Sequence, residues 1–175
     1  LLPLIDRLSD RIRLALHESE SAVRAAELRV GEAVTGDLEA YRHYFRGKDL
    51  AARGGALQEA VAELERAAEI DPHFVLARVE AAWIGYFSGL VPRAAAREIV
   101  REASRGAARA PAKEAGLTRI LAAFFDGRFA ASRAEILTLA RRFPEDRDLS
   151  VLGGGILGWC GFTEDALPLV QRALR

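Results

Sequence analysis

A glycine run in the last quarter of the sequence is its sharpest chemical motif. Residues Gly153-Gly154-Gly155-Ile156-Leu157-Gly158 match G-x-G-x-x-G, a string that binds a dinucleotide pyrophosphate when it follows a strand and opens a helix. The preceding segment, Pro144-Glu145-Asp146-Arg147-Asp148, is too charged for a buried strand. We therefore predict that these glycines lie within a helix, where they let a neighbouring helix approach closely, and that no cofactor is bound.

Histidine, cysteine and carboxylate side chains show no catalytic or metal-binding pattern. His17, His43 and His73 lie far apart, and none belongs to an H-E-x-x-H motif. The single cysteine, Cys160, has no His or Cys near it in sequence and is predicted to be a small buried side chain. The densest carboxylates share one predicted helix with arginines, as on a solvated face: Glu59, Glu63, Glu65 and Glu69. The sequence thus predicts neither catalytic residues nor a metal.

Composition excludes several classes of protein. Lys and Arg number 25 and Asp and Glu number 25 among 175 residues, so the chain lacks the basic excess of a nucleic-acid-binding domain. Half of the residues are hydrophobic, which excludes disorder for most of the chain. Charged residues interrupt every apolar stretch, so no segment is predicted to insert into a membrane. A single cysteine favours a reducing, cytoplasmic location. We expect a protein or peptide as the partner.

Helices must position the side chains, because Ala, Leu, Arg and Glu dominate the sequence and alternation at period two is hard to find. The glycines Gly55, Gly89, Gly127 and Gly161 lie 34, 38 and 34 residues apart. Five places after each glycine comes a small residue: Ala60, Ala94, Ser132 and Ala166. Twelve places after each glycine comes an apolar residue, except in the second repeat, where Arg101 stands. This recurrence predicts a fold of repeated helix pairs.

Each repeat is predicted to be two antiparallel helices joined by a short turn. In the first repeat an apolar run gives way at Arg53-Gly54-Gly55, and a second run continues from Leu57 to Asp71-Pro72. The glycine closes the first helix because it adopts the left-handed conformation at little cost. The small residue after it lets the two helix backbones approach each other.

The pattern resembles the tetratricopeptide repeat (TPR), a 34-residue unit with a turn glycine, small residues and a closing proline at these intervals. The resemblance is carried by Tyr44, Ala60, Ala67, Asp71-Pro72, Ala82, Gly89 and Ala94. It implies an all-α fold, a right-handed α-solenoid. The predicted array spans 37–175, with hairpins at about 38–72, 73–110, 111–145 and 146–175. The extra four residues of the longer glycine interval are predicted near Ser104–Ala108.

Residues 1–36 are predicted to form a helical cap or linker outside the phase of the repeats. One apolar stripe runs along Leu4, Ile5, Leu8, Ile12 and Leu16. Together with Asp37–Tyr41 and Tyr44–Gly47, this segment is similar to the one that introduces TPR arrays in large bacterial signalling proteins, including serine/threonine kinases and adenylate cyclases. The similarity implies a regulatory region that is not itself an enzyme, within a larger protein such as a kinase, an adenylate cyclase or a winged-helix regulator.

The first helices of the repeats carry an apolar and aromatic stripe. In the second repeat, positions 79, 83, 86 and 87 fall on one helix face. The TPR resemblance implies that this face lines a concave partner-binding groove. The predicted groove residues are Phe45, Val79, Trp83, Tyr86, Phe87, Leu121, Phe124 and Trp159, with Arg42, Arg46 and Arg53 as an electrostatic rim. The alternative is that the aromatic residues pack between successive repeats or against the predicted N-terminal helix Leu4–Leu16.

Two functions of different kinds follow from these predictions. The first is a non-enzymatic interaction or regulatory module that binds a peptide or helix on its concave face. The second is homodimerisation or larger assembly through the last helix, Asp165 to Arg175, where an apolar end would otherwise be exposed. A small-molecule carrier or an enzyme that uses the glycine run ranks third.

Overall fold

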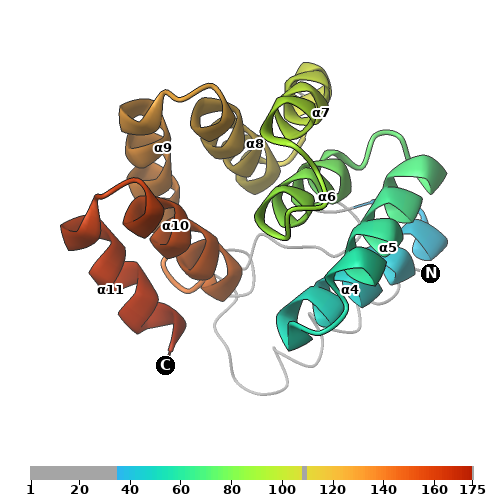
Figure 1. The fold of residues 1–175 in the computed structure, drawn as a ribbon, viewed down its shortest axis with the longest axis horizontal. Helices are drawn as coiled ribbons and strands as arrows, with labels where there is room; N and C mark the ends of the chain where they lie inside the picture. The colour runs from blue at the N-terminus through green and yellow to red at the C-terminus, as the bar shows by residue number, and fades with distance from the viewer. Residues whose placement is uncertain (1–34, 108–109, 175) are drawn as a thin grey trace, which may run out of the picture. The chain divides into compact units, whose positions relative to one another are not determined.

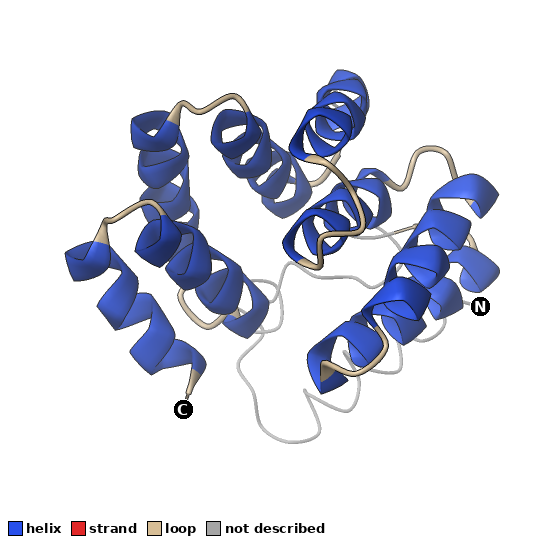
Figure 2. Cartoon of the chain, in the orientation of Figure 1, coloured by secondary structure: helices blue, strands red, loops and turns tan. Residues whose placement is uncertain are grey.

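The computed structural model describes residues 35–107 and 110–174, which form helices and their connections (Figure 1). Figure 2 shows no strand in these two ranges. Their helices are α4 (Leu38–Arg53), α5 (Leu57–Ile70), α6 (Val75–Phe87), α7 (Arg93–Gly106), α8 (Ala112–Phe125), α9 (Phe129–Arg142), α10 (Arg147–Trp159) and α11 (Thr163–Ala173). The predicted all-α, helical-repeat class of fold is confirmed. The predicted cap of residues 1–36 lies, up to position 34, outside the described residues.

The chain divides into two compact units, with the boundary between Leu90 and Val91. In the first unit α4 packs along α5, and α5 packs along α6. In the second unit α7 packs on α8, α8 on α9, α9 on α10, and α10 on α11. Each helix within a unit therefore packs on the next one in sequence, as in a helical repeat. Because α6 and α7 belong to different units, the hairpin predicted at 73–110 stays a prediction.

Local sequence explains where several helices begin. The carboxylate of Asp37 caps α4 by accepting hydrogen bonds from the N–H groups of Glu39 at 2.8 Å and Ala40 at 3.0 Å. Asp146 caps α10 in the same way, accepting from the N–H of Leu149 at 2.8 Å. A side-chain acceptor at this position satisfies N–H groups that have no partner inside the helix. These caps fix the start of the first helix in two of the predicted repeats.

Glycines with positive φ end the first helices of the pairs. Gly89, Gly127 and Gly161 adopt φ of +75°, +74° and +85°, as the repeat predicts. In the first pair the residue with positive φ is Gly54, at +74°, and not Gly55. The N–H of Gly54 donates to the carbonyl oxygen of Ala51 at 3.1 Å and so closes α4. The predicted turn glycine is therefore one residue too late in this repeat.

The small residues predicted at the helix crossings are buried in three repeats of four. Ala60, Ser132 and Ala166 are buried. A Cβ added to Gly47 of α4 would lie 2.9 Å from the carbonyl oxygen of Ala60, so the two helices approach backbone to backbone. At the crossing of α8 and α9, the Ser132 hydroxyl donates to the carbonyl oxygen of Ile120 at 3.1 Å.

The repeat around α7 departs from the predicted register. Ala94 is exposed, and Ala96 is buried in its place. The reason is the turn before α7, which has five residues, 88–92, where three separate α4 from α5, α8 from α9 and α10 from α11. The same shift of two residues puts buried Ala103 where Arg101 broke the pattern. Two of the four extra residues thus lie in this turn and not near Ser104–Ala108, where the sequence predicts them.

Candidate functional site

The predicted groove residues on α6 form one aromatic cluster. The ring centroids of Trp83 and Phe87 lie 4.0 Å apart, and Tyr86 packs edge-on against Phe87 at 5.1 Å. The side chain of Phe87 is 40% exposed, while Trp83 and Tyr86 are half-buried. Adjacent aromatic rings held on one helix offer a large apolar contact area at a small entropic cost, and are typical of binding surfaces.

A second aromatic cluster lies on α4, in the same unit. The rings of Tyr41 and Phe45 lie 4.5 Å apart, and Phe45 is 45% exposed. Tyr44 packs edge-on against Phe45 at 5.2 Å and is itself buried against Phe74, whose ring centroid is 4.8 Å away. Tyr41 is absent from the predicted groove residues. Its spacing of four residues from Phe45 is the sequence signal that identifies it, because residues four apart meet on a helix surface.

A shielded carboxylate joins the helices that carry the two clusters. Oε1 of Glu80 on α6 accepts hydrogen bonds from the hydroxyl of Tyr44 at 3.0 Å and from Nζ of Lys48 at 3.2 Å, both on α4. Only 14% of the Glu80 side chain is exposed, so these charge-assisted bonds form where water competes weakly. Glu80 therefore holds α4 and α6 in register. No pattern in the sequence marks it, because its partners lie 32 and 36 residues away.

Three of the predicted groove residues belong to the core. Val79, Leu121 and Phe124 are at most 1% exposed. The ring of Phe124 packs against Phe129 of α9 at 5.9 Å, and the guanidinium of Arg93 on α7 lies 5.7 Å from its centroid. The prediction is corrected for these three residues, because neighbouring helices close over positions that the repeat pattern alone leaves open.

Trp159 is the most exposed of the predicted groove residues. It stands at the end of α10 and is 68% exposed, and Val151, two turns earlier, is also exposed. Gly155 and Gly158 lie between them, and a Cβ on either would meet nothing within 4 Å. The outer side of α10 therefore combines bare backbone with two apolar side chains, and Trp159 remains a candidate contact residue.

Two of the three rim arginines are paired within the first unit. Nε of Arg46 lies 3.2 Å from Oε1 of Glu63, and Nη2 of Arg53 lies 2.7 Å from Oδ2 of Asp49. Arg42 is exposed and forms no ion pair with another described residue. His43 is half-buried, with Nδ1 2.6 Å from Oε2 of Glu63. Arg42 is therefore the rim arginine best placed to attract an acidic partner.

The glycine run lies within α10, with no strand before it in the described residues. A Cβ on Gly153 would lie 2.8 Å from Cγ2 of Ile136 on α9, and one on Gly154 would lie 2.8 Å from Cγ2 of Val170 on α11. The predicted close approach of neighbouring helices is confirmed at these two glycines. The arrangement lacks the strand-to-helix turn that would present backbone N–H groups to a pyrophosphate.

Cys160 caps the end of α10 and is half-buried. Burial raises the pKa of its thiol, and the positive charge of Arg93 opposes this only in part. The neutral thiol is thus favoured at physiological pH, whereas a nucleophilic cysteine needs the thiolate.

We expect Cys160 in the folded protein to react with a maleimide more slowly at neutral pH than a free cysteine does, because less thiolate is present. The labelling rate should keep rising with pH beyond the range in which the free thiol levels off. Unfolding in urea should remove the difference. A folded-state rate at neutral pH equal to that of free cysteine would contradict the raised pKa.

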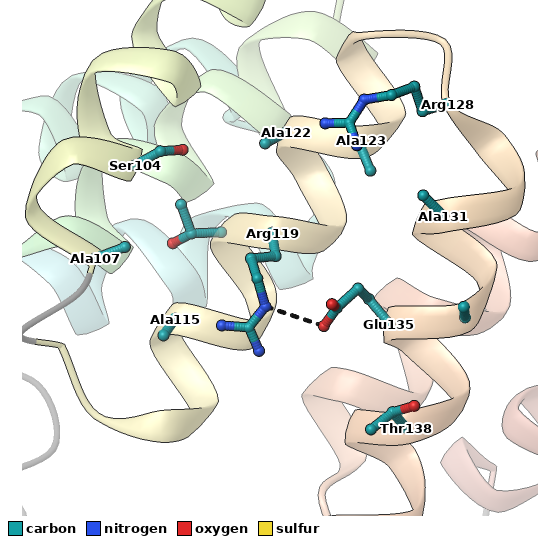
Figure 3. Close-up of a pocket in the computed structure, with 12 residues that line it drawn as sticks. Ser104, Ala107, Ala115, Arg119, Ala122, Ala123, Arg128, Ala131, Glu135 and Thr138 are labelled. Carbon is teal, nitrogen blue, oxygen red and sulfur yellow. Dashed lines mark hydrogen bonds and ion pairs between the residues drawn. The ribbon is translucent and has the colours of Figure 1, made fainter.

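A groove of about 620 Å³ lies between α7, α8 and α9 of the second unit (Figure 3). Alanines from the three helices leave this space open, including Ala107, Ala115, Ala122 and Ala131. Nε of Arg119 lies 3.1 Å from Oε2 of Glu135, and this ion pair spans the groove between α8 and α9. Arg128, at one end, is paired with Asp126 at 3.1 Å. Glu135 therefore balances the charge of Arg119, whereas Arg128 shares the single carboxylate of Asp126 with Arg97, whose Nε lies 2.7 Å from Oδ1.

Two further findings concern the described part of the chain as a whole. Within 35–107 and 110–174, no group of three or more His, Cys, Asp or Glu side chains could hold a metal ion. In the same ranges, none of the helices has the length and apolar character required to cross a membrane.

Comparison with known proteins gives likenesses among solved structures alone. No family model matches the chain, and no curated protein matches it. Among solved structures, a chain described as "MamA RS-1 ArsTM double mutant" is similar at 18% sequence identity with a TM-score of 0.40. The match covers 99% of this chain and 93% of that one. The fold assignment here rests on the chain's own helices, caps and turn glycines.

Proposed function

We propose that this chain is a non-enzymatic protein-interaction module that binds a peptide or helix through the aromatic clusters of its first unit. The observation that carries the proposal is the cluster of Trp83, Tyr86 and Phe87, which is apolar and partly exposed on a helix held by Glu80. Large exposed apolar patches are uncommon on monomeric proteins unless they bind something. Rigid aromatic side chains are also the residues that carry most binding energy in interfaces.

The chemistry of the two clusters specifies the kind of partner. Rings at positions 83, 86 and 87 of α6 and at 41 and 45 of α4 accept aliphatic or aromatic side chains that recur along one face of a helix or along a short extended segment. The charge of Arg42 favours acidic residues beside those anchors. The proposed ligand is therefore an amphipathic, acidic segment of another protein.

The proposed role is regulatory, within a larger bacterial signalling protein in the cytoplasm. The similarity of residues 1–47 to the segment that introduces TPR arrays in serine/threonine kinases and adenylate cyclases supports this context. In such a protein the module would bring a partner to the output domain and would contribute no catalytic group of its own.

The test is to select peptides from a random display library on the immobilised protein and to measure their affinity for variants. We expect Phe87→Ala to weaken the selected peptides by about 30-fold, because a central aromatic anchor contributes about 2 kcal/mol. Fluorescence anisotropy of a labelled peptide measures the dissociation constant. Circular dichroism checks that each variant remains folded.

Phe129→Ala is the matched control, because Phe129 is exposed to a similar extent, 37%, but lies on α9 in the second unit. It should leave the affinity unchanged. Selected peptides that bind Phe87→Ala and Phe45→Ala as tightly as the unaltered protein would refute the aromatic surface as the binding site. A failure to enrich any peptide over the library background would count against the function itself.

A further inference from the structure

The groove of the second unit lies on a face of α8 that the predicted partner-binding surface does not include. Its floor is formed by Ala115, Arg119 and Ala122 of α8, and its walls by α7 and α9 (Figure 3). Leu121 and Phe124, which the sequence placed in a groove, lie on the other side of the same helix and are buried. The volume of about 620 Å³ falls within the range of about 300–1,000 Å³ that is usual for ligand-binding clefts.

The width of the groove favours an extended chain over a helix. Packed helix axes lie about 8–10 Å apart, so the axes of α7 and α9, on either side of α8, are at most about 20 Å apart. Each helix is about 10 Å or more across with its side chains, which leaves at most about 10 Å between the two walls. Small side chains keep this space open: Ser104 and Ala107 on α7, and Ala131 and Ala134 on α9. A further helix is too wide for the groove, whereas an extended segment fits.

The helices around the groove carry an excess of positive charge. The described residues from 93 to 142 include ten Lys or Arg and five Asp or Glu, although the whole chain is neutral. Lys113 and Arg133 pair with Asp146 and Asp165, which lie outside this range. The cations that remain still outnumber the carboxylates, so this part of the second unit attracts acidic ligands.

One positive charge stays unbalanced at the end of the groove, where α8 turns into α9. Nε of Arg97 and Nη2 of Arg128 lie 2.7 Å and 3.1 Å from the two carboxylate oxygens of Asp126. These hydrogen bonds hold the pKa of Asp126 below its usual range, so its carboxylate is charged at neutral pH and balances one of the two arginines. Each guanidinium has five N–H groups and donates one of them to Asp126. The others are available for a second carboxylate.

Along the groove, Arg119 is held by an ion pair that a ligand can replace. Arg119 and its partner Glu135 are 56% and 36% exposed. Ion pairs as exposed as this one are weak, because water and salt compete with them. A carboxylate of a ligand can therefore take the place of Glu135 on Arg119 at little cost.

We infer that this groove binds an extended, acidic segment of another protein, with one carboxylate on Arg119 and another on Arg97 and Arg128. Along α8, Arg119 and Asp126 are about 10 Å apart, a distance that an extended chain covers in about three residues. Alternate side chains of such a chain point to the same side, so carboxylates at alternate positions can reach both places. The groove uses residues of the second unit, and the proposed peptide site uses residues of the first. Their tests therefore succeed or fail independently.

Fluorescence anisotropy with a labelled peptide of about ten residues, alternating Glu and Ala, tests the groove on the full 175-residue chain. This peptide lacks the aliphatic and aromatic side chains that the aromatic clusters of the first unit would bind. The reference is the same peptide with Gln in place of Glu. We expect the acidic peptide to bind about tenfold more tightly than the reference. Equal affinity for the two peptides, or no binding of the acidic one, would overturn the inference.

Removal of positive charge locates the site. Arg119→Gln combined with Arg128→Gln should weaken binding of the acidic peptide by about tenfold. The control, Arg66→Gln combined with Arg133→Gln, removes the same charge from exposed arginines that pair elsewhere, on α5 and with α11, and should change the affinity by less than about twofold. Equal losses in the two double variants would show that the peptide responds only to total charge, and the groove would not be its site.

Two further substitutions separate the groove from a merely structural role of its arginines. Glu135→Gln should tighten binding by about threefold because it frees Arg119, whereas Glu69→Gln, in an exposed pair of α5, should not. Ala122→Leu fills the floor without a change of charge and should weaken binding by about tenfold, while Ala130→Leu, at an exposed position of α9 outside the groove, is its control. Circular dichroism checks that each variant is folded. A folded Ala122→Leu variant with unchanged affinity would overturn the inference.

Discussion

Replacing Phe124 by alanine is expected to lower the free energy of unfolding by about 3–5 kcal/mol, because it leaves a cavity in the core of the second unit. The ring is 1% exposed and packs against Phe125 at 5.3 Å and Phe129 at 5.9 Å. The guanidinium of Arg93 would also lose the aromatic face on which it lies. Equilibrium unfolding in urea, followed by far-ultraviolet circular dichroism, measures the change.

Phe45→Ala provides the comparison for this measurement. Phe45 is 45% exposed, so its removal forfeits less buried area and should cost well under half as much as the loss of Phe124. Equal losses for the two variants would show that the ring of Phe124 is as accessible as that of Phe45. Phe124 would then return to the groove predicted from the sequence.

A pair of double substitutions in the glycine run should change stability in opposite directions. Gly153→Ala combined with Gly154→Ala is expected to lower the free energy of unfolding by about 2–3 kcal/mol. Each new methyl group would lie 2.8 Å from a branched side chain of a neighbouring helix, and overpacking of this kind outweighs the better helix propensity of alanine. Thermal and urea unfolding both report the change.

Gly155→Ala combined with Gly158→Ala supplies the matched control within the same helix. These positions have nothing within 4 Å of the added methyl group. The gain in helix propensity is therefore unopposed, and stability should rise by about 1 kcal/mol or slightly more. If the two double variants had the same effect, the close approach of α9 and α11 to α10 would not be the reason for glycine at 153 and 154.

Periodicity in the sequence was sufficient to predict the class of fold and the turn glycines that follow α6, α8 and α10. The turn glycines at 89, 127 and 161 have the positive φ that the repeat requires, because only the local chain decides that conformation. The sequence could not predict that Gly54, and not Gly55, has the positive φ, because two adjacent glycines can each adopt that conformation. The shift around α7 follows from two residues in a turn, and repeat spacing alone does not say where extra residues lie.

The candidate site was harder to predict, because exposure depends on what neighbouring helices cover. Phe87 and Phe125 each stand two residues before the turn glycine of an equivalent helix. Phe125 is 2% exposed and packs against Phe124 at 5.3 Å, whereas Phe87 stays 40% exposed. The link from Glu80 to α4 depends on tertiary contact alone. Helical periodicity therefore identifies a face, and packing decides which of its side chains a partner can reach.

Cys160, the single cysteine of the sequence, lies in the turn between α10 and α11, so its reactivity can report the local separation of these two helices. Among the described helices α11 packs mainly on α10, and a helix held by few contacts opens locally at low cost. Local separation of these two helices would uncover the sulfur without unfolding the rest of the molecule. The kinetics of thiol modification would then measure how often α11 separates from α10, and slower modification at high protein concentration would reveal an association that keeps the two helices together.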